Sequence, residues 1–172
     1  MFMANDDLFP SEQLRDMLEE PITLGQDDYR SIGSEALDLL VLMARHPDAL
    51  WLRARMAGTE NLYEVFLCEN EYLADADYER LMGWAEEADE HLRERALIHL
   101  ASNPATPESV LVRIAERTVP QDANMWHRLS RHPKAGKTLW SYVIEREDIS
   151  EYSKGVAKTR MASDGDSEQF VY

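Results

Sequence analysis

The sequence contains only one cysteine, seven glycines and seven prolines among its 172 residues. One thiol can form neither an internal disulfide nor a cysteine-based metal cage, so we interpret Cys68 as a small core hydrophobe. So few glycines and prolines argue against a turn-dense β-rich protein and against a low-complexity chain. The hydrophobic fraction of 44% instead predicts a globular protein of one domain.

Long hydrophobic runs are also missing. The strongest apolar stretch, 36–44, is far shorter than a membrane span and contains Asp38. The first residues lack the basic and apolar segments of a secretion signal. Together with the lone cysteine, these absences predict a cytoplasmic protein with no membrane partner.

Basic residues are scarce in the N-terminal part, and no lysine occurs before Lys134. Residues 1–100 carry the whole net charge of −15, because residues 101–172 hold equal numbers of acidic and basic side chains. In the densest stretch, 59–90, eleven carboxylates accompany a single basic residue, Arg80. Such a negative field opposes direct binding of nucleic acid and favours a protein partner with a basic surface.

The short motifs that carry chemistry are absent as well. The sequence has no phosphate-binding loop, no serine-nucleophile elbow and no zinc-hydrolase helix. Its five histidines lack the spacing that puts two metal ligands on one helical turn. A faint likeness of 75–86 to a calcium loop fails because Arg80 stands where glycine is required. We therefore predict a protein that is not an enzyme and has no metal and no cofactor.

Helical periodicity, in contrast, is present throughout. Apolar residues recur three and four positions apart, and no segment shows the alternation of a strand. Asp89, Thr106 and Asp122 are predicted to cap helix N-termini, with Pro107 at the first helical position. The helix predicted from residue 34 to 45 is apolar on nearly every side, which indicates a buried central helix.

The predicted helices divide the chain into three regions. Residues 1–33 are expected to form an N-terminal helical cap, with a helix that starts near Pro10. Residues 34–150 are expected to hold helical repeats. Residues 151–172 are small and polar for the most part, so we predict a mobile C-terminal tail.

Helix ends of one form recur along the chain: a small residue, any residue, Asn or His, and then proline. The small residue lets helices approach closely, Asn or His can satisfy carbonyls at the helix end, and proline prevents another turn. This repeat mark occurs at 44–47, 101–104 and 130–133, with a degenerate copy that lacks proline at 68–71.

A second apolar helix follows each mark. Repeats of this length are typical of helical solenoids. The predicted fold is therefore all-α, an irregular α-solenoid or helical-repeat superhelix of about four helix pairs. The alternative is that similar helix ends arose by chance in a helical protein.

Residues 96–115, read as Ala-Leu-Ile-His-Leu-Ala-Ser-Asn-Pro-Ala-Thr-Pro-Glu-Ser-Val-Leu-Val-Arg-Ile-Ala, resemble the leucine-rich repeat variant family, a HEAT-like helical repeat. The likeness is good over 84–117 and partial over 36–58 and 125–147. It implies a superhelix of stacked short and long helices and a role in protein interaction. Some members hold an iron–sulfur cluster on additional cysteines, which Cys68 alone cannot do.

The predicted function is a non-enzymatic protein–protein interaction module with an acidic N-terminal half. The alternative is an acidic nucleic-acid mimic that occupies the basic groove of a DNA-binding protein. Aromatic and arginine side chains are common anchors of interfaces. The alternative, which the sequence favours, is that Trp126 belongs to the core and the charges around it are ordinary surface. The candidate partner-binding residues are Glu79, Glu86, Glu87, Asp89, Glu90, Trp126, Arg128 and Arg131.

Overall fold

The computed structural model describes residues 22–23, 34–54, 56–57 and 60–167. Over these residues it contains nine helices and one pair of two-residue strands, which confirms the all-α prediction. The chain divides into two compact units, Met1–Tyr72 and Leu73–Tyr172. Most of the predicted N-terminal cap, including the helix expected near Pro10, lies outside the described residues.

The first unit contains three helices and the two short strands. Helix α2 contacts both α3 and α4, and β1 pairs in parallel with β2. Helix α3 is short and ends at Arg53, and the chain then forms β2 at Met56–Ala57. The bounds are β1 Ile22–Thr23, α2 Ser34–Ala44, α3 Ala49–Arg53, β2 Met56–Ala57 and α4 Glu60–Leu67.

The prediction that α2 is buried on nearly every side is wrong. Leu40 and Met43 are buried, but Leu39 is 42% exposed and Leu42 is 43% exposed. Helices α3 and α4 contact α2, and within the described residues Leu39 and Leu42 are left partly uncovered. Cys68 is fully buried just after α4, in agreement with its interpretation as a core residue.

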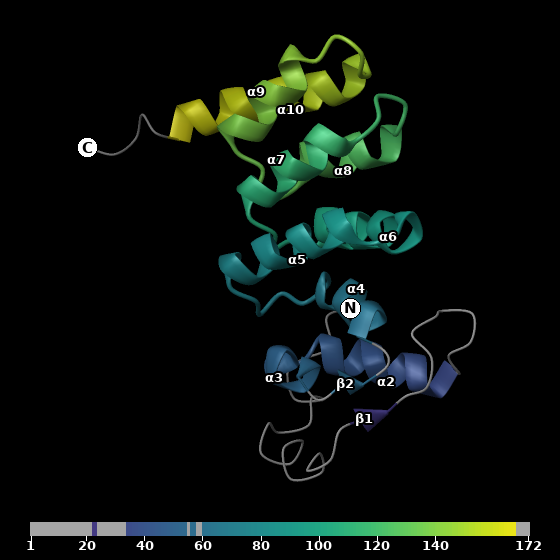
Figure 1. Cartoon of the computed structure of the whole chain (residues 1–172). Helices are drawn as coiled ribbons and strands as arrows, with labels where there is room; N and C mark the ends of the chain where they lie inside the picture. Colours follow the sequence, from purple (N-terminus) through teal and green to yellow (C-terminus); the bar gives the residue numbers. More distant parts are fainter. Residues whose placement is uncertain (1–21, 24–33, 55, 58–59, 168–172) are drawn as a thin grey trace. The chain divides into compact units, whose positions relative to one another are not determined.

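The second unit is built from six helices in two layers (Figure 1). In the first layer α7 contacts α5 and α9, and in the second layer α8 contacts α6 and α10. Each helix also contacts the next one along the chain, so the layers are joined as successive pairs, a packing compatible with a helical repeat. The bounds are α5 Asp75–Glu87, α6 Glu90–Ser102, α7 Glu108–Arg117, α8 Ala123–Arg131, α9 Lys137–Glu145 and α10 Glu151–Ser167.

The helix starts predicted at Asp89 and Asp122 are confirmed. The Asp89 carboxylate accepts a hydrogen bond from the backbone N–H of Leu92 at 3.0 Å. The Asp122 carboxylate accepts one from the backbone N–H of Met125 at 2.9 Å. Each bond satisfies a donor that the first turn of a helix leaves open, so local chemistry sets the starts of α6 and α8.

The predicted cap of α7 is wrong. Pro107 occupies the N-cap position, and Thr106 lies one residue earlier, where it is fully buried. The Thr106 hydroxyl donates to the carbonyl of Leu100 at 2.7 Å. Thr106 therefore satisfies a carbonyl in the last turn of α6 and fastens the α6–α7 loop, and it does not cap α7.

The N-terminus of α9 is capped by the neighbouring helix of its layer. The Glu108 carboxylate at the start of α7 accepts from the backbone N–H groups of Gly136 at 3.0 Å and Leu139 at 2.9 Å. A Cβ at position 136 would lie 2.7 Å from this carboxylate, so glycine gives Glu108 the room to approach. Successive helices of the first layer are thereby joined by charge-assisted hydrogen bonds.

The sequence predicts a mobile tail from residue 151, but the structure has α10 over Glu151–Ser167 in its place. This helix contacts α8 and α9, with Ser153 and Ala157 buried. The small residues that resemble a disordered composition let α10 approach its neighbours closely. None of the described helices, α10 included, is long and apolar enough to cross a membrane.

Candidate functional site

The four repeat marks place one buried Asn or His side chain each at the end of a helix. Every one of them accepts a hydrogen bond from the backbone N–H two residues later, so each mark contains the same tight turn. The bonds run from Asp48 to His46 Nδ1 at 3.0 Å, from Tyr72 to Asn70 Oδ1 at 2.7 Å, from Ala105 to Asn103 Oδ1 at 2.9 Å and from Lys134 to His132 Nδ1 at 3.1 Å.

The other end of the side chain connects one mark to the preceding one. In the first unit, Asn70 Nδ2 donates to the carbonyls of Ala44 at 2.6 Å and His46 at 2.9 Å. In the second unit, His132 Nε2 lies 2.7 Å from the carbonyl oxygen of Asn103. Since His132 Nδ1 accepts a hydrogen bond, its proton is on Nε2, which donates to Asn103. In these two marks the side chain satisfies backbone carbonyls near the end of an earlier helix, and those carbonyls belong to the preceding mark. Asn103 Nδ2 instead donates to the hydroxyl of Tyr78.

Acidification is expected to destabilise the second unit through His132. Burial lowers the pKa of His132, and the nearby charges of Lys134 and Arg160 lower it further, whereas the hydrogen bond to Asn103 opposes the shift. Below the ordinary histidine pKa of about 6.5, the unfolded chain binds the proton and the folded chain does not. Stability is therefore full above this pH and falls below it, by at most about 1.4 kcal/mol per pH unit.

Urea unfolding between about pH 7.5 and pH 5.5 measures this effect. The variant His132→Asn copies the residue that the chain itself uses at position 103, and we expect it to lose this part of the pH dependence. His91→Asn is the matched control, because His91 is exposed. If His132→Asn kept the full pH dependence of the wild type, the buried neutral imidazole would not be its source.

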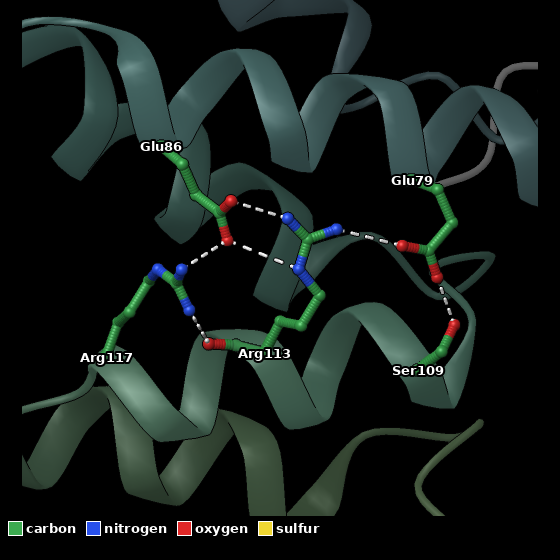
Figure 2. A network of polar contacts seen from close by, with 5 residues as sticks. All are labelled: Glu79, Glu86, Ser109, Arg113 and Arg117. Carbon is green, nitrogen blue, oxygen red and sulfur yellow. Dashed lines mark hydrogen bonds and ion pairs between the residues drawn. The ribbon is translucent and has the colours of Figure 1, made fainter.

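Two of the predicted partner-binding acids belong to an ionic network between α5 and α7 (Figure 2). Arg113 lies between them, with Nη1 3.0 Å from Glu79 Oε2 and Nη2 2.6 Å from Glu86 Oε2. Arg117 Nη2 lies 2.7 Å from Glu86 Oε1, and Ser109 donates to Glu79. The hydrogen bond to Glu86 is the main reason why the pKa of Arg113 is raised.

The network changes the interpretation of the acidic stretch 59–90. Glu79 and Glu86 are neutralised by arginines from the next repeat, so they join two helices of the first layer. In the first unit, Glu64 pairs with Arg53 and Glu69 pairs with Arg45. The sequence offered one signal of this arrangement, two arginines one turn apart on α7, but pairing over some thirty residues is not visible from spacing.

The remaining predicted acids lie at the turn between α5 and α6. Asp89 caps α6, as described above. Glu87 and Glu90 are exposed, and neither has an ion-pair partner among the residues that the structure describes. We refer to Glu87, Asp89 and Glu90 as the acidic turn.

Trp126 lies in the core, in agreement with the interpretation that the sequence favours, and this burial argues against its candidate role as a partner-binding residue. Its side chain is 1% exposed, and its Nε1 donates to the carbonyl of Val119 at 3.0 Å. The Arg146 guanidinium lies over the ring, 5.5 Å from its centroid. Trp126 therefore fills the space under the α7–α8 loop, where no partner can reach it.

Arg128 and Arg131, in contrast, are exposed on α8. Arg128 Nη1 donates to Ser102 Oγ of α6 at 2.6 Å, and Arg131 Nη2 donates to the hydroxyl of Tyr152 in α10 at 2.9 Å. Arg160 of α10 reaches back to the carbonyl of Arg131 at 2.6 Å. We refer to Arg128, Arg131 and Arg160 as the arginine face; sequence reasoning missed Arg160 because it assigned that residue to a tail.

Comparison with known proteins adds no assignment. No family model, no curated protein and no solved structure matches this chain. Within the described residues, no three His, Cys, Asp or Glu side chains are grouped so that they could hold a metal ion. The likeness to leucine-rich repeat variant proteins therefore stays a prediction.

Proposed function

We propose that the chain is a non-enzymatic helical-repeat module that binds another protein. The observation that supports this is that some of its charged side chains form ion pairs within the structure and others do not. Charges between successive repeats are paired, as in the Arg113 network, and buried polar groups such as His132 join one repeat to the next. At the acidic turn and on the arginine face, charged groups have no partner of opposite charge in the part of the chain that the structure describes.

The proposal keeps the partner chemistry that the sequence favours, a protein with a basic surface in the cytoplasm. Glu87 and Glu90 are the best candidates to meet it, because both are exposed and no arginine neutralises them. Exposed charges at the rim of an interface mainly accelerate association and make binding sensitive to salt. The superhelical stack and the leucine-rich repeat variant character are part of the same proposal.

The alternative, a nucleic-acid mimic, has less support. Such a mimic needs a row of free carboxylates that copy phosphates. Glu64, Glu69, Glu79 and Glu86 are each paired with an arginine, so these acids contribute little free negative charge. Of the other acids in 59–90, Asp77 and Asp89 accept hydrogen bonds from backbone N–H groups at the starts of α5 and α6, so these carboxylates already have partners.

The experiment is capture of partners from native cells by the full-length chain, followed by binding measurements with the purified partner. We expect Glu87→Gln combined with Glu90→Gln to weaken binding about tenfold at low salt. The matched control, Glu145→Gln with Glu147→Gln, removes the same charge from another exposed part of the unit. Equal binding by both double variants, or no partner retained by the wild type, would contradict the proposal.

A further inference from the structure

The arginine face differs in its pairing from five other arginines that the structure describes. Those five form ion pairs with carboxylates: Arg45, Arg53, Arg113, Arg117 and Arg146. Among the described residues, the three arginines of the arginine face donate only to neutral oxygens, a serine hydroxyl, a tyrosine hydroxyl and backbone carbonyls. In a chain of net charge −15, these guanidinium groups keep their full positive charge and free N–H donors for an external anion.

The arrangement is held in place before any ligand binds. Tyr152 is 58% exposed and its ring stacks on His127, with centroids 5.8 Å apart and an angle of 13° between the planes. Its hydroxyl accepts the hydrogen bond from Arg131. Side chains that are already ordered lose less conformational entropy on binding, so this group is suited to recognition.

Beside the arginines lies a groove on α10 with a volume of about 420 Å³. It is lined by Tyr152, Gly155, Val156, Thr159 and Arg160. These positions recur three and four apart, so they form one stripe along the helix. Gly155 leaves the groove open, because an added Cβ there would meet nothing within 4 Å.

We propose that this surface binds an acidic peptide segment of another protein, with one large apolar side chain in the α10 groove and carboxylates on Arg131 and Arg160. The inference rests on the proposed role as an interaction module, and it adds a second surface with its own partner chemistry. Guanidinium groups suit carboxylates because they can donate two parallel hydrogen bonds. An apolar groove next to them favours a segment that contains both acidic residues and a large apolar residue.

A peptide fits this surface better than a nucleic acid does. The acid excess of the chain lies in residues 1–100, and residues 101–172, which hold the groove, carry equal numbers of acidic and basic side chains. A long polyanion needs an extended basic surface, and a region without net charge does not provide one. A short segment with a single apolar anchor needs no such surface, because it contacts only the groove and its rim.

The test uses the full-length chain and a short fluorescent peptide of Asp and Glu residues with one central phenylalanine. We expect the wild type to bind it and Gly155→Met to bind at least about tenfold more weakly, since the new side chain fills the groove. Gly83→Met is the matched control: Gly83 is also helical, and an added Cβ there meets nothing within 4 Å. Both variants should keep the wild-type urea midpoint or raise it, because glycine is unfavourable inside helices.

A second pair of variants tests the charge. Arg131→Ala should weaken peptide binding. Lys158→Ala removes the same charge from an exposed position of α10 and should not weaken it. The inference is overturned if Gly155→Met binds as well as Gly83→Met, if a peptide with alanine in place of phenylalanine binds equally, or if oligothymidylate binds more tightly than the peptide. It is also overturned if sedimentation shows that a second copy of the chain fills the groove, as self-association that Gly155→Met abolishes.

The two proposals fail separately. Loss of partner binding in the acidic-turn variant with no peptide binding in the groove would leave the module proposal intact and remove only this inference. Peptide binding that depends on Gly155, without any partner that depends on Glu87 and Glu90, would remove the acidic turn as a binding surface and support the groove.

Discussion

Replacement of Trp126 by alanine is expected to lower the free energy of unfolding by about 3–5 kcal/mol. The ring is 1% exposed, so its removal leaves a cavity in the core of the second unit. It also leaves the carbonyl of Val119 without its donor and Arg146 without the aromatic face beneath it. Urea unfolding followed by near-ultraviolet circular dichroism measures the loss.

Two further variants show whether Trp126 acts through packing. Trp126→Phe keeps most of the apolar volume and loses the hydrogen bond to Val119, so we expect a smaller loss of about 1–2 kcal/mol. Tyr152→Ala removes an exposed ring, and we expect a change within about 0.5 kcal/mol. A Trp126→Ala protein with unchanged stability and impaired partner binding would restore the role of Trp126 as an interface anchor.

The second large effect is expected from Asn70→Ala, at about 2–4 kcal/mol of destabilisation in the first unit. Asn70 is 1% exposed and connects three backbone groups: it donates to the carbonyls of Ala44 and His46 and accepts from the N–H of Tyr72. Alanine leaves all three without this partner, and buried polar groups without partners are costly. Local hydrogen exchange of the α4 amides reports the effect on this unit.

Asn124→Ala is the control for this change, because Asn124 is exposed on α8 and makes no hydrogen bond through its side chain among the described residues. We expect it to change stability by less than about 0.5 kcal/mol. If Asn70→Ala were equally mild, the polar side chain of the repeat mark would not hold successive helices together. The marks would then reflect only the ending of a helix by proline, although the degenerate mark at 68–71 contains no proline.

Local chemistry explains which features were predictable. The caps at Asp89 and Asp122 depend only on residues within one turn, so the starts of α6 and α8 followed from the sequence. The repeat mark was visible for a similar reason, since proline and a preceding Asn or His act on the nearest carbonyls. The cap predicted at Thr106 was wrong because its buried hydroxyl donates to a carbonyl six residues earlier and does not bond to the first turn of the next helix.

Composition misled the prediction at the C-terminal end. Serine, glycine and alanine are common in mobile tails, but α10 is a helix that contacts α8 and α9, with Ser153 and Ala157 buried. Whether small residues mean disorder or close packing depends on what lies opposite them. That neighbour is set by the fold, so the groove on α10 and Arg160 could not be found from the sequence.

The sequence alone is sufficient for the helical class, the starts of α6 and α8, the repeat mark and the excess of acid in the first hundred residues. These features depend on periodicity, on capping within one turn and on a simple count of charges. Only the tertiary structure shows which charges are paired, because an ion pair depends on distance in space. It neutralises Glu79 and Glu86 through Arg113, buries Trp126, and leaves Arg128, Arg131 and Arg160 beside an open groove without a carboxylate partner among the described residues.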